Sequence, residues 1–311
     1  MPGYNSLTMN IDFIIPEQSQ LGRGGTASIF SGNLINQTLI QMHGTSEIAV
    51  KVFPKDESML SASSIDQKSN FMYEVALMNL IPASPNIVKF IGHMESPELA
   101  IIMKKYEGSL DGLISKKVVP MGPALAFKIA TDIASGMNLI HNMNVLHLDV
   151  KPHNMLWERT SDGGLNFCIC DFGFASLVGE SRNVISGLQI PKAVGITIRY
   201  TAPEVFLNLA MRSNEAGRAK SESCKKIDVY AYGLSMYFVL LGANYWPNIE
   251  TQEIMVRVRQ GVRPSIGDIP ALLHNDPRSK AIITLIEQCW NGNPNERPSF
   301  GTIVQSLAAL K

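Results

Sequence analysis

The sequence predicts a two-lobed α+β protein, in which a small strand-rich lobe precedes a larger, mainly helical lobe. Up to about residue 105, short runs of branched apolar residues alternate with turn-forming residues. From Pro123 onward, apolar residues recur at helical spacing instead. The chain has 311 residues, of which 45% are hydrophobic, so it is long enough to bury a substantial core.

Four short apolar runs predict the strands of the first lobe, at residues 11–15, 48–53, 87–90 and 99–103. A helix is expected over residues 70–80, because Phe71, Val75 and Met78 give that segment one apolar face. The Ser-rich, aperiodic residues 54–70 predict a surface loop, with regulatory or partner contact as the alternative to a simply solvated loop.

The second lobe begins near residues 106–110, so we expect lobes at residues 12–105 and 106–311. The apolar stripes that predict its helices are formed by Ala126, Ile129, Ile133, Met137 and Ile140, by Ile283, Leu285 and Ile286, and by Ile303, Leu307 and Leu310. Residues 229–243 predict a buried central helix with Asp228 as its N-cap. The polar residues 211–226 predict a second surface loop, for which partner contact is again the alternative.

Charge and apolar patterning exclude several classes of protein. The 27 basic and 27 acidic side chains cancel, and basic runs are no longer than pairs such as Lys104-Lys105, so we expect no nucleic-acid partner. The longest apolar run is shorter than the roughly 20 residues that cross a bilayer, so no membrane partner is expected. The first basic residue is Arg23 and residue 2 is Pro2, so we expect neither a signal peptide nor an N-myristoyl group.

The cysteines indicate a reducing compartment, and we expect a cytoplasmic protein. The chain has four of them, without paired zinc-site spacing: Cys168, Cys170, Cys224 and Cys289. The sequence carries no signal for an oligomeric state.

A glycine-rich segment at residues 21–29 follows a strand signal and continues into another strand. Gly22, Gly24 and Gly25 would let backbone amides approach phosphate oxygens without a Cβ in the way. A dinucleotide-binding fold would need a helix next, so a glycine-rich hairpin fits better. A merely structural turn is the alternative.

Lys51 ends a strand that is expected to be buried, where an ammonium costs several kcal/mol unless it meets negative charge. Glu74, on the helix expected over residues 70–80, can supply that charge. In such a pair, Glu74 would hold the Lys51 ammonium in place against a polyphosphate. Taken singly, each side chain also fits an exposed charge whose stem packs on apolar surface.

The densest group of polar residues is His-Leu-Asp-Val-Lys-Pro-His-Asn at 147–154, and it is followed by Cys-Asp-Phe-Gly at 170–173. With the glycine-rich segment and Lys51, these motifs resemble, in order, those of the eukaryotic protein kinase domain. Ala-Pro-Glu at 202–204, Asp-Val-Tyr-Ala-Tyr-Gly at 228–233 and Arg297 extend the resemblance over roughly residues 12–310. It implies the two-lobed kinase fold, with a small antiparallel sheet and one helix in the first lobe.

Three details make the resemblance closest to the tyrosine-kinase-like group, serine/threonine type. The segment 289–300, with its Cys-Trp and Arg-Pro-Ser-Phe, is similar to tyrosine kinases and their relatives. Lys151, two residues after Asp149, resembles the form found in serine/threonine kinases. Thr197, seven residues before Glu204, falls where those kinases keep a threonine near the catalytic aspartate. Tyrosine as a second acceptor stays open.

The resemblance implies ATP and Mg²⁺ as cofactors and a protein as the phosphate acceptor. Asp149 would orient the acceptor hydroxyl and take its proton, and Lys151 would offset charge on the γ-phosphate. Asn154 and Asp171 would supply oxygen ligands to Mg²⁺. Thr197 would complete the catalytic group.

The resemblance also implies where the nucleotide binds. Lys51, fixed by Glu74, would hold the α- and β-phosphates, and Met103 would border the back of the pocket with residues 104–106 as the hinge. The residues so implied are Leu21, Gly22, Gly24, Gly25, Ala27, Ile29, Ala49, Lys51, Met103, Tyr106 and Leu156. The apolar character of Ile29, Ala49 and Leu156 fits core packing equally well. Cys170 is expected to border the same pocket, or to be a buried unreactive thiol.

Three residues depart from the family pattern. Ala27 replaces the third glycine of the loop, and Ile196 replaces a common glycine before Thr197. Leu148 replaces the arginine that normally pairs with a phosphorylated activation segment. We therefore hypothesise that activity does not depend on phosphorylation of that segment. Glu204 and Arg297 resemble the buried pair that ties the segment to the second lobe.

Two other functions remain as alternatives. A pseudokinase scaffold would bind nucleotide without efficient transfer, because intact motifs do not prove a closed Lys51–Glu74 pair. A small-molecule phosphotransferase of related fold would generally lack the Ala-Pro-Glu segment at 202–204. The protein kinase interpretation requires that Lys51, Asp149, Asn154 and Asp171 act on one metal-bound triphosphate. The sequence does not name the protein substrate or the pathway.

Overall fold

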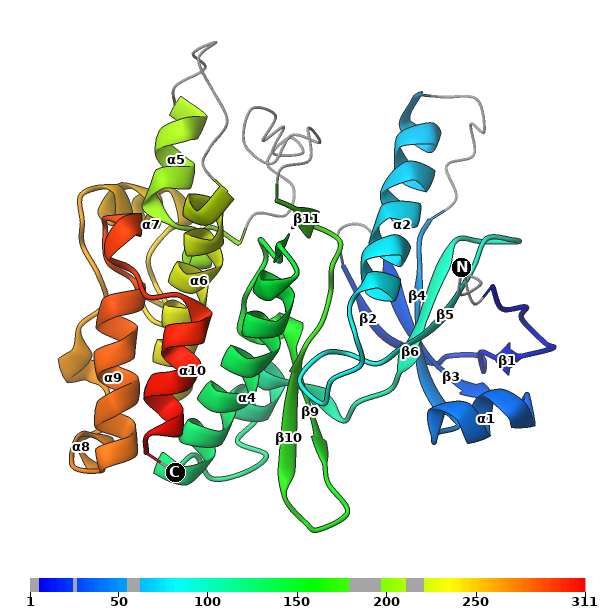
Figure 1. Ribbon diagram of the computed structural model, residues 1–311, viewed down its shortest axis with the longest axis horizontal. Helices are drawn as coiled ribbons and strands as arrows, with labels where there is room; N and C mark the ends of the chain where they lie inside the picture. Colours follow the sequence, from blue (N-terminus) through cyan, green and yellow to red (C-terminus); the bar gives the residue numbers. More distant parts are fainter. Residues whose placement is uncertain (1–5, 25–26, 55–61, 179–196, 211–220, 311) are drawn as a thin grey trace. The chain divides into compact units, whose positions relative to one another are not determined.

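The computed structural model describes residues 6–24, 27–54, 62–178, 197–210 and 221–310 (Figure 1). It divides the chain into two compact units, Met1–Glu107 and Gly108–Lys311. The first unit is built on an antiparallel sheet and the second is mainly helical, so the α+β class expected from the sequence is confirmed. Among the described residues, no helix combines the length and the apolar character that crossing a membrane requires.

The sheet of the first unit has six strands in the order β1-β3-β4-β6-β5, with β2 paired to β3. The strands are β1 (Phe13–Ile14), β2 (Gln20–Arg23), β3 (Ser28–Leu34), β4 (Glu47–Val52), β5 (Phe90–Met94) and β6 (Ala100–Lys104). A strand is expected at residues 87–90, but β5 begins only at Phe90. Residues 85–86 form a turn, and residues 87–89 precede the first residue of β5 that pairs with β6. Phe13, Ile48, Val50 and Ile102 belong to the buried core cluster of this unit.

The glycine-rich segment forms the expected hairpin. Strand β2 pairs antiparallel with β3, with Gly22 opposite Ile29 and Arg23 opposite Ser28. The amide of Gly24 donates to the carbonyl of Ala27 at 2.8 Å. Gly25, which the sequence singles out for phosphate contact, lies outside the described residues.

The described part of the first unit also contains helices α1 (Gln37–His43) and α2 (Ala62–Leu80). Helix α2 covers the predicted helix at 70–80, and its Phe71 and Val75 side chains are buried. It begins earlier than predicted, so residues 62–70 are helical and the loop expected at 54–70 is wrong in that part. Of that loop, residues 55–61 lie outside the described residues.

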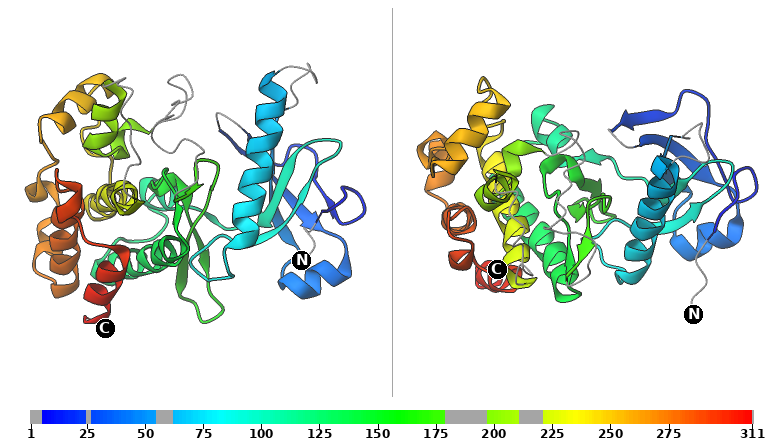
Figure 2. Two further views of the ribbon diagram at one scale, coloured as in Figure 1. Left: turned by 45° about the horizontal axis from the view of Figure 1, so that its top comes forward. Right: turned by 90° about the horizontal axis from the view of Figure 1, so that it is seen from above.

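In the second unit, the long helix α4 packs against α6, α9, α10 and strand β10 (Figure 2). The helices are α3 (Leu110–Ser115), α4 (Pro123–Asn142), α5 (Pro203–Ala210), α6 (Ser221–Leu241), α7 (Thr251–Arg259), α8 (Ala271–His274), α9 (Pro277–Cys289) and α10 (Phe300–Ala308), with short 3-10 turns η1 (Pro152–Asn154), η2 (Ile198–Tyr200), η3 (Ile266–Asp268) and η4 (Pro294–Glu296). The strands are β7 (Gly108–Ser109), β8 (Val145–Leu146), β9 (Met155–Arg159), β10 (Leu165–Ile169) and β11 (Ser176–Leu177). The three apolar stripes lie on α4, α9 and α10, although Leu310 follows the end of α10.

Helix α6 is the buried central helix that the apolar run predicts, but its start corrects two expectations. It begins at Ser221, so residues 221–226 are helical rather than part of a loop. Residues 211–220 of that predicted loop lie outside the described residues. Asp228 therefore lies inside the helix and is not its N-cap. Its fully buried carboxylate binds another part of the chain, as described below.

Candidate active site

The first unit contains the expected ion pair between Lys51 on β4 and Glu74 on α2. Lys51 Nζ lies 2.7 Å from Glu74 Oε1 and 3.1 Å from Glu74 Oε2. Both side chains are buried, at 8% and 5% exposure. A buried ammonium in contact with both oxygens of a carboxylate is held in one position, because leaving either charge alone would cost several kcal/mol.

The strand register places the predicted adenine contacts on the same sheet face as Lys51. Ile29 lies opposite Lys51, and Ala49 lies opposite Met103. Opposed residues of an antiparallel pair share a face, as do residues two apart in a strand. Val50, between Ala49 and Lys51, is fully buried in the core cluster on the other face. Ile29, Ala49 and Met103 are only half-buried, so their face is the more open one.

The outer part of the predicted nucleotide site is more exposed. Leu21 is 54% exposed, and nothing lies within 4 Å of the position that a Cβ on Gly22 would occupy. Ala27 is buried at the end of the hairpin turn. In the predicted hinge, the Tyr106 hydroxyl accepts a hydrogen bond from Lys89 N at 3.2 Å.

The segment 147–154, which carries the predicted catalytic residues and is called the catalytic loop below, lies in the second unit, between β8 and β9. Lys151 Nζ lies 2.7 Å from Asp149 Oδ2 and donates to the Thr197 hydroxyl at 2.9 Å. Asn154 Nδ2 donates to Asp149 Oδ2 at 2.8 Å and to the Asp149 carbonyl at 2.9 Å. One network therefore brings together four residues that the sequence analysis singles out.

Asp149 sits in an environment suited to a base. Burial raises the pKa of its carboxyl, the positive charge and hydrogen bond of Lys151 oppose that effect, and the nearby Asp171 carboxylate adds to it. The net direction is upward. A carboxylate with a raised pKa holds a transferred proton more readily than an ordinary surface aspartate.

Asp228 on α6 positions the start of the catalytic loop, a role that the sequence analysis missed. Its Oδ2 atom accepts from the His147 amide at 2.8 Å and its Oδ1 atom from the Leu148 amide at 2.7 Å. His141 Nε2 lies 2.9 Å from Oδ2. Burial raises the pKa of this carboxyl, but the His141 bond and the other contacts outweigh burial and lower it, so Asp228 is ionised. The sequence shows Asp228 directly before the apolar run at 229–243, where an N-cap is the simpler interpretation, and nothing in that segment indicates its distant partners.

His147 joins the catalytic loop to the segment that carries Asp171. His147 Nε2 lies 3.0 Å from the Cys170 carbonyl, and its Nδ1 atom accepts from the Asp149 amide at 3.3 Å. A carbonyl only accepts, so the proton sits on Nε2. The His147 ring also packs 5.3 Å from the ring of Phe172, which is buried. His147 is thus a packed structural residue.

Oxygen ligands suited to Mg²⁺ lie in this loop region. The amide nitrogen of Asn154 is used by Asp149, so its amide oxygen is the atom that can bind a hard cation. Asp171 has a left-handed backbone, with φ 66°, and its carboxylate acts electrostatically on Asp149. Carboxylate and amide oxygens beside a second carboxylate fit a divalent cation.

Leu156 and Cys170 lie on or beside the β9–β10 hairpin of the second unit. Leu156 is half-buried and lies opposite Cys168 on β10 and Ser109 on β7. The Cys170 amide donates to the Asn154 carbonyl at 2.9 Å, and its side chain is 9% exposed. Leu156 therefore sits next to the catalytic loop, and the buried Cys170 directly precedes Asp171.

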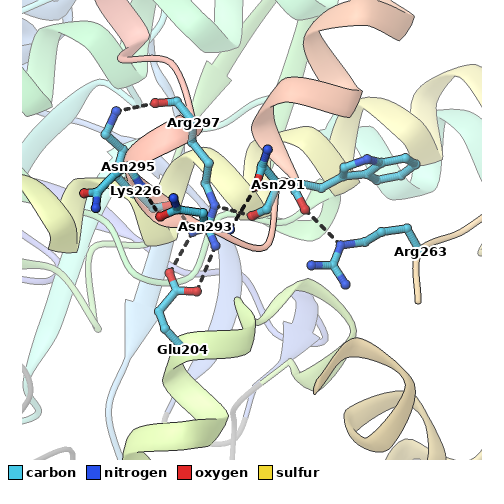
Figure 3. A network of polar contacts seen from close by, with 8 residues as sticks. Glu204, Lys226, Arg263, Asn291, Asn293, Asn295 and Arg297 are labelled. Atoms are coloured by element: carbon cyan, nitrogen blue, oxygen red, sulfur yellow. Dashed lines mark hydrogen bonds and ion pairs between the residues drawn. The ribbon is translucent and has the colours of Figure 1, made fainter. Parts of the chain in front are cut away.

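Glu204 and Arg297 form the expected pair between α5 and the segment before α10 (Figure 3). Arg297 Nη1 and Nη2 donate to the two Glu204 oxygens at 2.7 and 2.8 Å. The guanidinium, which is fully buried, also donates to the carbonyls of Asn291 and Lys226, each at 2.8 Å. Removing Glu204 would leave a buried charge with only carbonyl partners, at a cost of about 3–5 kcal/mol.

Comparisons with known proteins agree with this arrangement. The family model described as the protein kinase domain matches residues 16–307. Dual specificity protein kinase shkA of Dictyostelium discoideum is 29% identical over 304 residues, which are 95% of this chain and 49% of that protein. Serine/threonine-protein kinase CTR1 of Arabidopsis thaliana is 29% identical, over 87% of this chain and 29% of that protein. Serine/threonine-protein kinase 12 of the same plant is 30% identical, over 85% of this chain and 52% of that protein. The chain spans about half, or less, of the length of these relatives.

Proposed function

The chain belongs to the protein kinase family, and on that basis we propose that it transfers the γ-phosphate of ATP to serine or threonine hydroxyls of proteins. The observation that carries the proposal is the network in which Lys151 contacts both Asp149 and Thr197. Two relatives named as serine/threonine kinases support the choice of acceptor. In this proposal residues 12–105 and 106–311 form the two kinase lobes.

Each residue of the second unit has a role that its surroundings support. Asp149 orients the acceptor hydroxyl and takes its proton, for which its buried carboxyl is suited. Lys151 offsets charge on the phosphoryl group as it moves, since phosphoryl transfer depends mainly on positioning and charge neutralisation. Thr197 fixes the Lys151 ammonium beside Asp149.

The nucleotide and metal roles are part of the same proposal. Lys51, held by Glu74, binds the α- and β-phosphates, and the hairpin from Gly22 to Ala27 covers them. Asn154 and Asp171 would hold Mg²⁺, which supplies charge neutralisation on the phosphate oxygens when bound. The face carrying Ile29, Ala49 and Met103 contacts adenine, together with Leu21, Tyr106 and Leu156.

The proposal includes a cytoplasmic location, which four buried cysteines, none of them in a disulfide, support. It leaves the protein substrate unnamed. It competes with the pseudokinase scaffold, for which nucleotide binding without transfer would be the signature.

Transfer of radiolabelled phosphate to myelin basic protein, with Mg²⁺ and ATP, tests the proposal. We expect wild type to label serine and threonine, and Lys51→Met and Asp149→Asn to lose nearly all transfer. Lys68→Met is the matched control, because Lys68 lies on α2 and makes only an exposed pair with Glu95 among the ion pairs described. Binding of Mg²⁺-ATP by wild type without any transfer would support the scaffold instead.

A further inference from the structure

A turn in the second unit links the catalytic loop to the segment that precedes α7. It starts at Thr197 and continues through η2. The Thr197 carbonyl accepts from the Tyr200 amide at 2.8 Å and from the Thr201 hydroxyl at 3.3 Å, which keeps the turn compact. At its start, the Thr197 hydroxyl accepts from Lys151. The position of this turn therefore decides where the Lys151 partner lies.

Arg199 anchors the far side of the turn. Its Nη1 atom donates to the Tyr245 carbonyl and, at 3.3 Å, to the Trp246 carbonyl. The Tyr245 hydroxyl donates back to the Arg199 carbonyl. Both the backbone and the side chain of Arg199 are thus bound by one short segment. Hydrogen bonds from a charged donor are among the stronger ones in proteins.

The segment that receives Arg199 is firmly packed. Tyr245 is 3% exposed, and its ring meets the rings of Tyr200, Tyr237 and Trp246 edge-on at centroid distances of 6.3, 5.9 and 5.6 Å. The Arg199 guanidinium lies 5.2 Å from the Tyr245 ring centroid. A close-packed aromatic cluster moves little, so it is a fixed support for the turn.

We propose that Arg199 is a positioning residue for the protein acceptor, because it clamps residues 197–200 to Tyr245 and Trp246 and so keeps the Thr197 hydroxyl on Lys151. The inference rests on the proposed function. Lys151 and Asp149 are the groups proposed to meet the acceptor hydroxyl, so a loosened turn disturbs acceptor binding and alignment. The nucleotide groups Lys51 and Asp171 are not members of this clamp, so ATP handling is expected to stay intact.

Steady-state kinetics of Arg199→Met, with myelin basic protein and ATP varied separately, test this. Methionine keeps the length of the side chain and removes its donors. We expect kcat/KM for the acceptor to fall about tenfold, and KM for ATP to stay within about twofold of wild type. Arg199→Lys should recover part of the loss, because an ammonium can still donate to one carbonyl.

Arg257→Met is the matched control. Arg257 also faces this aromatic cluster, 5.6 Å from the Trp246 ring centroid, and it pairs with Glu253 at 2.8 Å on the same exposed helix face. It has no place in the clamp, so its kinetics should match those of wild type. Losses in acceptor and ATP parameters alike, with a lowered Tm, would show a merely structural role for Arg199 and overturn the inference.

A double-mutant cycle with Thr197→Val gives an independent test. If Arg199 acts through Thr197, Arg199→Met should add little further loss once the hydroxyl is gone, so the two losses do not multiply. Losses that do multiply would refute the mechanism. A wild-type chain without transfer would refute the proposed function and this inference together, whereas a fully active Arg199→Met would refute the inference alone.

Discussion

Single residues around Asp149 set the conditions under which the proposed chemistry runs. The Asp149 side chain is 10% exposed and lies 2.7 Å from the Lys151 ammonium. The Asp171 carboxylate also acts on it electrostatically. Burial and Asp171 raise the pKa of this carboxyl, whereas Lys151 lowers it. Substitutions of the neighbours should therefore move the pH at which Asp149 loses its activity as a base, as well as the rate.

The acidic limb of the pH profile should lie above the ordinary range of an aspartate. A base works only when deprotonated, and burial raises the pKa of Asp149, so activity falls at a higher pH on acidification. Lys151 lowers that pKa, so Lys151→Met should move the limb of kcat/KM further upward in the activity that remains. Lys128→Met, which removes a cation paired with Asp132 instead, should leave the limb in place. A limb that stays put in Lys151→Met would contradict this electrostatic account.

Leu148 predicts independence from activation-segment phosphorylation. Leu148 stands where kinases regulated in that way carry arginine, and an apolar side chain cannot pair with a phosphate. Treatment with a phosphatase should therefore leave the transfer rate within about twofold of the untreated chain. Of the serines that the segment offers, Ser176 is buried, and Ser181 and Ser186 lie outside the described residues. Activity lost to phosphatase and regained by rephosphorylation would count against the prediction.

At the scale of elements, α6 supports the catalytic loop through Asp228. The carboxylate accepts hydrogen bonds from the amides of His147 and Leu148 and contacts the ring of His141. His141 lies at the end of α4, and the two amides lie in the loop that follows β8. Leu148 has a left-handed backbone, with φ 64°, which is a strained conformation for leucine. The Asp228 bond to its amide holds that conformation in place.

Asp228→Asn should lower both stability and turnover. The asparagine amide has one acceptor oxygen, whereas the carboxylate has two, and the amide nitrogen would face N–H donors. We therefore expect a loss of about 3 kcal/mol in the free energy of unfolding. The pKa of Asp228 is lowered in the folded chain, so this stabilisation is present above the unfolded-state pKa near 3.8 and is lost as the pH falls through the folded-state pKa. Urea titrations across pH check both points.

Asp268→Asn controls for the substitution itself, because Asp268 is exposed on η3. Its free energy of unfolding should change by no more than about 0.5 kcal/mol. An Asp228→Asn chain as stable as wild type at neutral pH would show that the three hydrogen bonds do not position the loop.

The sequence predicts the elements whose signal lies in their own residues. Strand β4 and helix α4 carry their apolar patterns from end to end. Helix α1 was missed, because seven residues are too few to show a period, although its caps were visible: Asn36 accepts from Thr38 N and Leu39 N, and Gly44 has φ 66°. The first turns of α2 and α6 were read as loops, since their polar residues show no apolar stripe.

The candidate site divides in the same way. The Lys51–Glu74 pair and the Asp149 network were predictable from motifs, because each of these residues stands in a short sequence motif of its own or is a charge that needs a partner when buried. Asp228 and Arg199 were not, because their roles depend on partners 80 and 46 residues away in the chain. A spacing rule within one segment contains no information on such contacts.

At the scale of the whole molecule, the proposed chemistry is shared between two units that each fold around their own core. In this proposal the first unit contributes Lys51 as a cation for the phosphates, and the second contributes Asp149, Asn154 and Asp171 for the metal and the acceptor. Neither set can perform phosphoryl transfer alone, because the reaction needs both charge neutralisation and a positioned base. A nucleotide that uses both sets should make the stability of one unit depend on residues of the other.

Mg²⁺-ATP should therefore slow amide hydrogen exchange in both units at once, around residues 47–52 and around residues 149–173. At a concentration of about 100 times Kd, binding adds about 2.7 kcal/mol of stability. Lys51→Met should weaken the protection of residues 149–173, although the substitution lies in the first unit, because less nucleotide is bound at the same concentration. Lys68→Met should leave protection as in wild type. Protection confined to one unit, or protection of residues 149–173 that is unchanged in Lys51→Met, would show that the two sets of residues do not act on the same nucleotide.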